Sequence, residues 1–284
     1  MKERKIIGIS RSERFSPNLS TNDAAIFNCV AMELKQLEHE VDLYSEESFV
    51  ESGAEAQVIF SMARGTSTLK RLKDLGANGS LVINSALGVE NCIRKAMTEL
   101  LIAHCIPHPI SIVTETENAS IPNDFIPCWI KRGDSHAMVK EDVAFASCPE
   151  EAEGILADFR ERGIPNAVIN EHLEGDLVKF YGVAGTDFFH WFYPSPSSHS
   201  KFGLEKINGE ATGTAFQVEE LIRSCNMAAA VLDISVYGGD CIILPNGAFK
   251  IIDFNDWPSF SPCRETAGKS IAAHIHNMTL KTFR

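Results

Sequence analysis

Apolar and polar residues follow two different periods in the first third of the chain. Short apolar runs predict strands at 5–10, 40–44, 57–62 and 81–84. Apolar residues at helical spacing predict helices between these strands, at 21–37 and 66–75. Strands that alternate with helices in this way form a mainly parallel sheet covered by helices. The pattern therefore predicts an N-terminal α/β domain.

The remainder of the chain mixes strands and helices without regular alternation. Strands are predicted at 127–131, 143–145, 167–172, 177–183 and 232–237. Helices are predicted at 90–104, 149–162, 216–231 and from about residue 264 onward. We therefore expect an α+β region behind the α/β domain.

A period of two surrounds Asn246-Gly247, a dipeptide that strongly favours a two-residue hairpin turn. Such a turn would pair residues across the hairpin, namely Leu244 with Phe249, Ile242 with Ile251 and Asp240 with Asp253. Strand alternation would place Asn255 on the face of Asp253 and turn Ile252 and Phe254 toward a core. The sequence therefore predicts two carboxylates and one amide on one face of a hairpin.

Directly opposed carboxylates repel each other, so the predicted pair of Asp240 and Asp253 requires a positive charge nearby. Two carboxylates and a neutral amide oxygen suit a hard divalent cation such as Mg²⁺. Two alternatives stay open at this point. In the first, both acids are solvated at the rim of the hairpin. In the second, a bulge turns one of them away from the other.

Composition and charge narrow the class of protein. The 284 residues can form a large core and two or three subdomains, and the net charge of −12 argues against nucleic acid or a membrane surface as a partner. No apolar run approaches membrane-spanning length, and the first one is too short for a signal peptide. The eight cysteines form no Cys-x-x-Cys pair. We therefore expect free thiols and a cytoplasmic location.

The hairpin resembles the metal-binding end of the ATP-grasp superfamily, in which an acid, a hairpin and an acid-x-Asn motif follow one another. Asp240 is followed by Asp253-x-Asn255, and Asp253 takes the place of the usual glutamate. The resemblance implies that Asp240, Asp253 and Asn255 bind Mg²⁺ or Mn²⁺ and that ATP is the cofactor.

The same resemblance implies a domain organisation. A substrate-binding α/β domain with a parallel sheet would occupy residues 1–90, and a two-lobed ATP-grasp domain with antiparallel sheets would occupy 91–284. Within the second domain, the resemblance implies a lid subdomain at about 106–173 and a catalytic subdomain at about 174–284.

Phosphate contacts are implied for two basic residues. Arg94 matches the first phosphate-contacting residue of the superfamily, with Lys95 as the alternative. Lys131 matches the lysine that reaches the α and β phosphates, and its position in an apolar strand would demand an anion as partner. The alternative for Lys131 is a side chain that extends from the strand end into water.

Contacts with the nucleoside are implied for the segment that joins the two lobes. Backbone groups of Glu171, His172 and Leu173 would bind adenine. Asp176, with Glu174 as the alternative, would bind the ribose.

One segment departs from the usual pattern. Many ATP-grasp ligases cover the phosphates with a glycine-rich loop after the second lysine, whereas this chain has Gly133-Asp-Ser-His-Ala-Met138. His136 and the strand that contains Lys179 are similar to the inositol-phosphate kinases of the superfamily. That resemblance implies a phosphate contact for Lys179 and a catalytic role for His136. The alternative for His136 is a solvated loop histidine.

Three functions remain open. The first is an ATP-dependent ligase that joins a carboxylate to an amine or thiol through an acyl phosphate, with Arg94 and Lys131 stabilising the transferring group. The second is a kinase of a polyol or of an inositol or sugar phosphate, favoured by His136 and Lys179. The third is a non-catalytic nucleotide-binding protein.

The substrate is expected to be a small anionic molecule, and formation of an oligomer stays open. Candidate contacts for this substrate are Arg11, Arg14, Lys179, His190 and Lys201.

Overall fold

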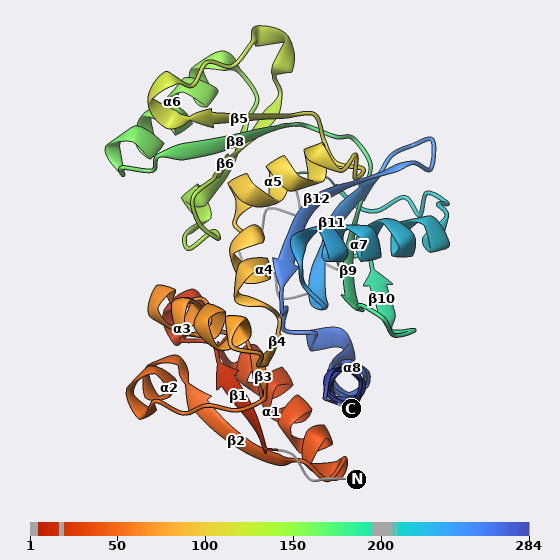
Figure 1. Ribbon diagram of the computed structural model, residues 1–284. Helices are drawn as coiled ribbons and strands as arrows, with labels where there is room; N and C mark the ends of the chain where they lie inside the picture. The colour runs from red at the N-terminus through yellow and green to blue at the C-terminus, as the bar shows by residue number, and fades with distance from the viewer. Residues whose placement is uncertain (1–4, 17–19, 195–206, 208, 284) are drawn as a thin grey trace.

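A computed structural model describes residues 5–16, 20–194, 207 and 209–283 of the chain. These residues form three four-stranded sheets with helices packed against them (Figure 1). The mixture of one parallel and two antiparallel sheets confirms the predicted fold class. No helix in these ranges is long and apolar enough to cross a bilayer.

The first sheet is parallel and has the order β2-β1-β3-β4. Its strands are β1 (Lys5–Ser10), β2 (Glu40–Ser45), β3 (Val58–Ser61) and β4 (Leu81–Ile83). Its helices are α1 (Ser20–Gln36), α2 (Glu46–Ser52) and α3 (Thr66–Ala77). Both central strands are almost wholly apolar because helices cover both faces of the sheet.

The second sheet is antiparallel, has the order β5-β8-β6-β7, and lies at the top of Figure 1. Its strands are β5 (Ser111–Glu115), β6 (Cys128–Arg132), β7 (Val143–Ala146) and β8 (Asn166–Glu171). Helix α6 (Pro149–Glu161) buries Leu156 and Phe159 against one face of the sheet.

The third sheet is antiparallel and has the order β10-β9-β11-β12. Its strands are β9 (Asp176–Val183), β10 (Phe189–Phe192), β11 (Val236–Ile243) and β12 (Phe249–Asp256). Helices α5 (Arg94–Ala103) and α7 (Val218–Leu232) pack against it, whereas α4 (Ala86–Asn91) buries Ala86 and Val89 in the core of the first sheet. Short 3₁₀ turns occur at Glu13–Phe15, Thr116–Asn118, Asn123–Phe125, Lys140–Asp142 and Ser261–Cys263.

Several predicted boundaries were wrong. The helix expected at 90–104 is two helices, because the Ser85 side chain caps α4 and the chain leaves helical geometry at Ile93. The strand expected from Leu232 begins only at Val236, because α7 continues through Leu232 and ends at Asp233 in the left-handed conformation. Elements α2, β5 and β10 were not predicted.

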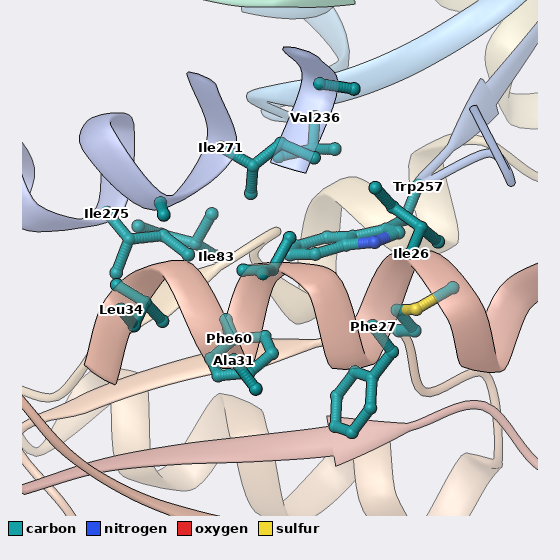
Figure 2. Packing of buried hydrophobic residues seen from close by; sticks show 14 of the residues in the cluster. Ile26, Phe27, Ala31, Leu34, Phe60, Ile83, Val236, Trp257, Ile271 and Ile275 are labelled. Atoms are coloured by element: carbon teal, nitrogen blue, oxygen red, sulfur yellow. The ribbon is translucent and has the colours of Figure 1, made fainter. Parts of the chain in front are cut away.

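The last helix, α8 (Arg264–Thr282), packs against α1 of the N-terminal domain. Figure 2 shows Ile275 of α8 next to Leu34 of α1, in one cluster with Ile271, and Trp257 next to Ile26 of α1. The C-terminal end of the chain thus completes the core of the first domain, although the sequence assigned residues 174–284 to a separate subdomain.

The side chain of Asn84 joins the first sheet to the third. Asn84 follows β4, and its amide oxygen accepts hydrogen bonds from the backbone N–H groups of Ser235 and Val236, both at 2.8 Å. The Asn84 amide nitrogen donates to the Val236 carbonyl at 2.7 Å. Asn84 therefore bonds to β11 much as a neighbouring strand would, and it fixes the two sheets relative to each other.

Candidate active site

A cavity of about 510 Å³ lies where the three sheets meet. Charged side chains from all three parts of the fold line its wall. They include Arg11 and Arg64 from loops of the first sheet, Asp23 from α1, Lys131 and Glu171 from the second sheet, and Lys179, Asp240 and Asp253 from the third. The first sheet faces the cavity with the loops that follow β1 and β3, at the carboxyl ends of its strands. Open α/β sheets bind ligands at that edge.

The β11–β12 turn is one residue longer than predicted. Residues 245–247 form a three-residue loop, closed by a hydrogen bond from the Leu244 N–H to the Ala248 carbonyl at 2.8 Å. Gly247 adopts a φ of 81°, which suits the left-handed position at the end of such a loop. Ile243 therefore pairs with Phe249 in place of Leu244, and the predicted pairings next to the turn were wrong.

A bulge in β12 then restores the predicted pair of acids. Cys241 pairs with Ile251 and Asp240 pairs with Asp253, so Ile252 is the extra residue. The predicted inward position of Ile252 was wrong, since its side chain lines the cavity, whereas Phe254 is buried as expected. The predicted pairing of Asp240 with Asp253 is confirmed, but two register changes that cancel each other produce it.

Basic side chains of the chain itself balance the two acids. The Lys179 ammonium on β9 lies 3.2 Å from both carboxylate oxygens of Asp240. The Arg94 guanidinium lies 3.5 Å from the Asp253 carboxylate. Lys131 donates to the Ile252 carbonyl at 3.0 Å, next to Asp253. Three cations thus converge on the acid pair, which explains how two opposed carboxylates are tolerated.

The charges shift one another's pKa values. Burial lowers the pKa of Lys131 to about 8, and the neighbouring Arg94 adds to this effect. Burial alone would raise the pKa of Asp253, but Arg94 and Lys131 lower it to about 2. Asp253 is therefore an anion at neutral pH, while the proton of Lys131 is weakly held and depends on a nearby anion.

The predicted metal ligands have suitable chemistry and positions. Asp240 and Asp253 are strand partners, and the Asn255 amide nitrogen donates to Asp253 at 3.0 Å. That bond leaves the Asn255 amide oxygen as the donor atom for a cation. All three residues line the cavity. Two carboxylates and an amide oxygen fit Mg²⁺ or Mn²⁺, so the residues present are compatible with the implied ion.

The structure distinguishes Arg94 from Lys95. Arg94 lines the cavity, whereas Lys95 points toward Asn166 at 3.4 Å and is not part of the cavity wall. The position of Arg94 in the cavity wall therefore agrees better with the predicted phosphate contact than the position of Lys95 does. Lys131 lines the same cavity and is 7% exposed, so the alternative of a side chain extended into water does not apply.

The segment predicted to bind adenine is partly engaged in the second sheet. The backbone N–H groups of Glu171 and His172 donate to the carbonyls of Ile110 and Pro127. The His172 ring accepts a hydrogen bond from the Trp129 indole. Glu171 and Leu173 line the cavity beside Trp129. The backbone N–H groups of Glu171 and His172 are thus occupied within the second sheet.

Asp176 does not have the position expected of a ribose ligand. It is 3% exposed and lies outside the cavity wall. Its carboxylate accepts hydrogen bonds from the backbone N–H groups of Thr212 at 2.7 Å and Thr214 at 2.8 Å. Asp176 therefore anchors the segment before α7, and its contact with a ribose stays a prediction. Glu174, the alternative, is exposed and also outside the wall.

A second charged group borders the cavity on the side of the N-terminal domain, and the sequence analysis missed its centre. Asp256 is buried and pairs with Arg64 at 2.6 Å and with Arg11 at 3.3 Å. Arg11 also pairs with Asp23 at 2.8 Å. Arg11, predicted as a substrate contact, is thus engaged by two carboxylates. Burial alone would raise the pKa of Asp256, but Arg64 and Arg11 lower it to about 2.

The remaining predicted residues differ in their position relative to the cavity. His136 lines the cavity with its Nε2 atom 3.6 Å from Asp256, and burial together with Arg64 lowers its pKa to about 3. It is not a solvated loop histidine. Arg14 is exposed and stacks over Phe15, and His190 is outside the cavity wall. Lys201 lies outside the described residues.

Comparisons with known proteins agree with this geometry. No protein-family model and no curated protein matches the sequence. Among solved structures, D-alanine–D-alanine ligase from Bacillus anthracis complexed with ATP is similar at a TM-score of 0.68 and 12% identity, over 98% of both chains. VanG D-Ala:D-Ser ligase from Enterococcus faecalis matches at 0.68 and 10%, over 98% of this chain and 99% of that one.

The ATP-grasp ligase PsnB, complexed with a minimal precursor, matches at a TM-score of 0.61 and 15% identity, over 98% of this chain and all of the other. Each similarity spans the N-terminal α/β domain as well as the two antiparallel sheets. Identities this low reveal a common fold and leave the activity to be tested. The chain has the ATP-grasp fold.

Proposed function

We propose that this protein is an ATP-dependent ligase that joins a carboxylate to an amine or thiol through an acyl phosphate and releases ADP and inorganic phosphate. The observation that carries the proposal is the convergence of Asp240 and Asp253 with Arg94, Lys131 and Lys179 at one cavity of an ATP-grasp fold. Acids for a metal and bases for phosphates lie in the same place, as phosphoryl transfer from ATP requires.

The nucleotide would lie between the second and third sheets. Its base would contact the apolar part of the wall, formed by Trp129, Leu173, Leu177 and Ile252. Its phosphates would extend toward Lys131 and Arg94, which stabilise negative charge in a site shielded from water. A Mg²⁺ or Mn²⁺ ion held by Asp240, Asp253 and Asn255 would neutralise the phosphate oxygens.

The acceptor would enter from the side of the N-terminal domain, near Arg64, and we propose that it is a small anionic molecule. Lys179 lines the same cavity and lies 3.2 Å from Asp240, so it would contact the transferring phosphoryl group or the acceptor oxygen. Proximity and charge neutralisation are then the main contributions of the chain to the rate.

A trapping experiment tests the reaction class. The enzyme is incubated with MgATP and either pools of carboxylic acids or pools of inositol and sugar phosphates, with or without hydroxylamine. ADP, hydroxamate and phosphorylated acceptors are measured. An acyl phosphate reacts with hydroxylamine, whereas a phosphorylated alcohol does not. We expect ADP and hydroxamate from at least one carboxylate pool. Stable phosphate transfer to inositol or sugar phosphates, without hydroxamate, would replace the ligase by the kinase.

A further inference from the structure

Asp256 receives contacts from three separate parts of the chain. It is the last residue of β12 and is 1% exposed. Arg11 comes from the loop after β1, Arg64 from the loop after β3, and His136 from the loop between β6 and β7. Asp256 also follows Asn255, one of the candidate metal ligands, on β12. Its contacts therefore connect β12 to loops of the first and second sheets.

The contacts with the first sheet are strong and geometrically defined. Both oxygens of Asp256 accept from Arg64, Oδ1 from Nη2 at 2.6 Å and Oδ2 from Nε at 3.4 Å. Arg11 donates to the backbone carbonyls of Met62 at 3.1 Å and Trp257 at 3.0 Å. The two loops that border the acceptor end of the cavity are therefore held together through Asp256 and its neighbours.

The contact with the second sheet is incomplete. The Nε2 atom of His136 lies 3.6 Å from Asp256, just beyond hydrogen-bond distance, and has no hydrogen-bond partner within the described ranges. The imidazole is buried and neutral, so its N–H donates to Asp256 after a shift of a few tenths of an ångström. A small movement of the β6–β7 loop toward the cavity would make this bond.

We propose that Asp256 is a positioning residue that couples the β6–β7 loop to the N-terminal loops, so that nucleotide binding orders the acceptor end of the cavity. The nucleotide would draw the second sheet onto the third, His136 would then donate to Asp256, and Arg64 and Arg11 would be held more firmly. The proposal rests on the nucleotide site proposed above, and it predicts an effect on residues that the nucleotide does not touch.

Hydrogen–deuterium exchange of the full chain with and without MgADP tests the coupling. In the parent protein we expect MgADP to slow exchange at residues 128–132, near the nucleotide, and also at residues 62–66, around Arg64. His136→Ala removes the link from the second sheet but keeps both arginine pairs of Asp256. In this variant we expect binding of MgADP and protection of 128–132 to persist, and protection of 62–66 to be lost.

Two further variants complete the test. Asp256→Asn should lose the same protection, and Asp134→Asn is the matched control, because Asp134 lies on the same loop but pairs with Arg132 at 2.7 Å. If Asp256→Asn does not fold, His136→Ala decides alone. Protection of 62–66 that persists in His136→Ala, or that never appears in the parent, overturns the coupling. A parent protein that does not bind MgADP overturns the nucleotide site itself, which is a distinct failure.

Discussion

Lys179 and Asp240 are strand partners on β9 and β11, and the lysine ammonium lies equally close, at 3.2 Å, to both carboxylate oxygens. A divalent cation at Asp240 must therefore compete with an ammonium group that is already present. The same competition would release Lys179 toward the transferring phosphoryl group when a metal ion binds.

This relationship predicts that Lys179→Met binds Mn²⁺ more tightly than the parent protein in the absence of nucleotide, because a positive charge next to a ligand has been removed. Electron paramagnetic resonance titration with Mn²⁺ measures the change. Hydroxamate formation with MgATP should fall in the same variant. Unchanged or weaker Mn²⁺ binding would show that Lys179 and the metal do not share Asp240.

The two acids should differ when each is changed to asparagine. Asp253→Asn leaves the buried cations Arg94 and Lys131 without their counter-ion and should lower the free energy of unfolding by about 1–3 kcal/mol. Asp240→Asn affects a more exposed pair with Lys179 and should cost less than about 1 kcal/mol. Urea unfolding measures both changes.

Both asparagine variants should lose Mg²⁺-dependent binding of ATP, which titration calorimetry detects. Retention of this binding by both variants would remove the acid pair from the metal site.

Nucleotide affinity should depend on pH through Lys131. Its pKa of about 8 means that the ammonium loses its proton above pH 8, while bound phosphates favour the charged form. Affinity for MgADP should therefore be full below pH 8 and fall by up to about tenfold per pH unit above it. In Lys131→Met the affinity should be lower throughout and its fall above pH 8 should be absent. A parallel fall in both proteins would assign the titration to another group.

Arg94 and Lys95 offer a matched comparison of neighbours. Arg94→Met should weaken MgADP binding by on the order of 1.5–3 kcal/mol, the range for hydrogen bonds to charged groups. Lys95→Met should leave binding unchanged, because Lys95 is outside the cavity wall. Equal losses in the two variants would contradict the assignment.

Asp176→Ala tests the role of that acid. Loss of the bonds to Thr212 and Thr214 should lower the free energy of unfolding by about 1–3 kcal/mol, because two backbone N–H groups lose a charged acceptor. MgADP affinity should stay the same. A selective loss of affinity, with stability unchanged, would restore the ribose contact that the sequence predicted.

Local pattern was sufficient for much of the fold and for the acid pair. The alternation around Asn246-Gly247 predicted that Asp240 would oppose Asp253, although the longer turn and the bulge at Ile252 could not be read from it. A bulge adds one residue to one strand and disturbs the alternation of apolar and polar residues only locally. It is therefore hard to detect in the sequence.

Ion pairs between residues far apart in the sequence could not be predicted from local patterns. Arg64 and Asp256 are separated by 192 residues, and no spacing rule joins them. Arg64 did follow a predicted strand at its carboxyl end, which was a usable signal. The bonds of Asp176 to Thr212 and Thr214 could not be predicted, because these threonines lie in a segment without periodic structure.

The packing of α8 on α1 also determines when the hydrophobic core of the first domain can be completed during synthesis. Helix α1 leaves the ribosome early, but Ile26 and its apolar neighbours are covered only after Ile271 and Ile275 have been made (Figure 2). Until then the nascent chain carries an exposed apolar face, the kind of surface that chaperones bind. The core of the α/β domain is thus completed only after α8 has been made, although the strands of this domain are encoded first.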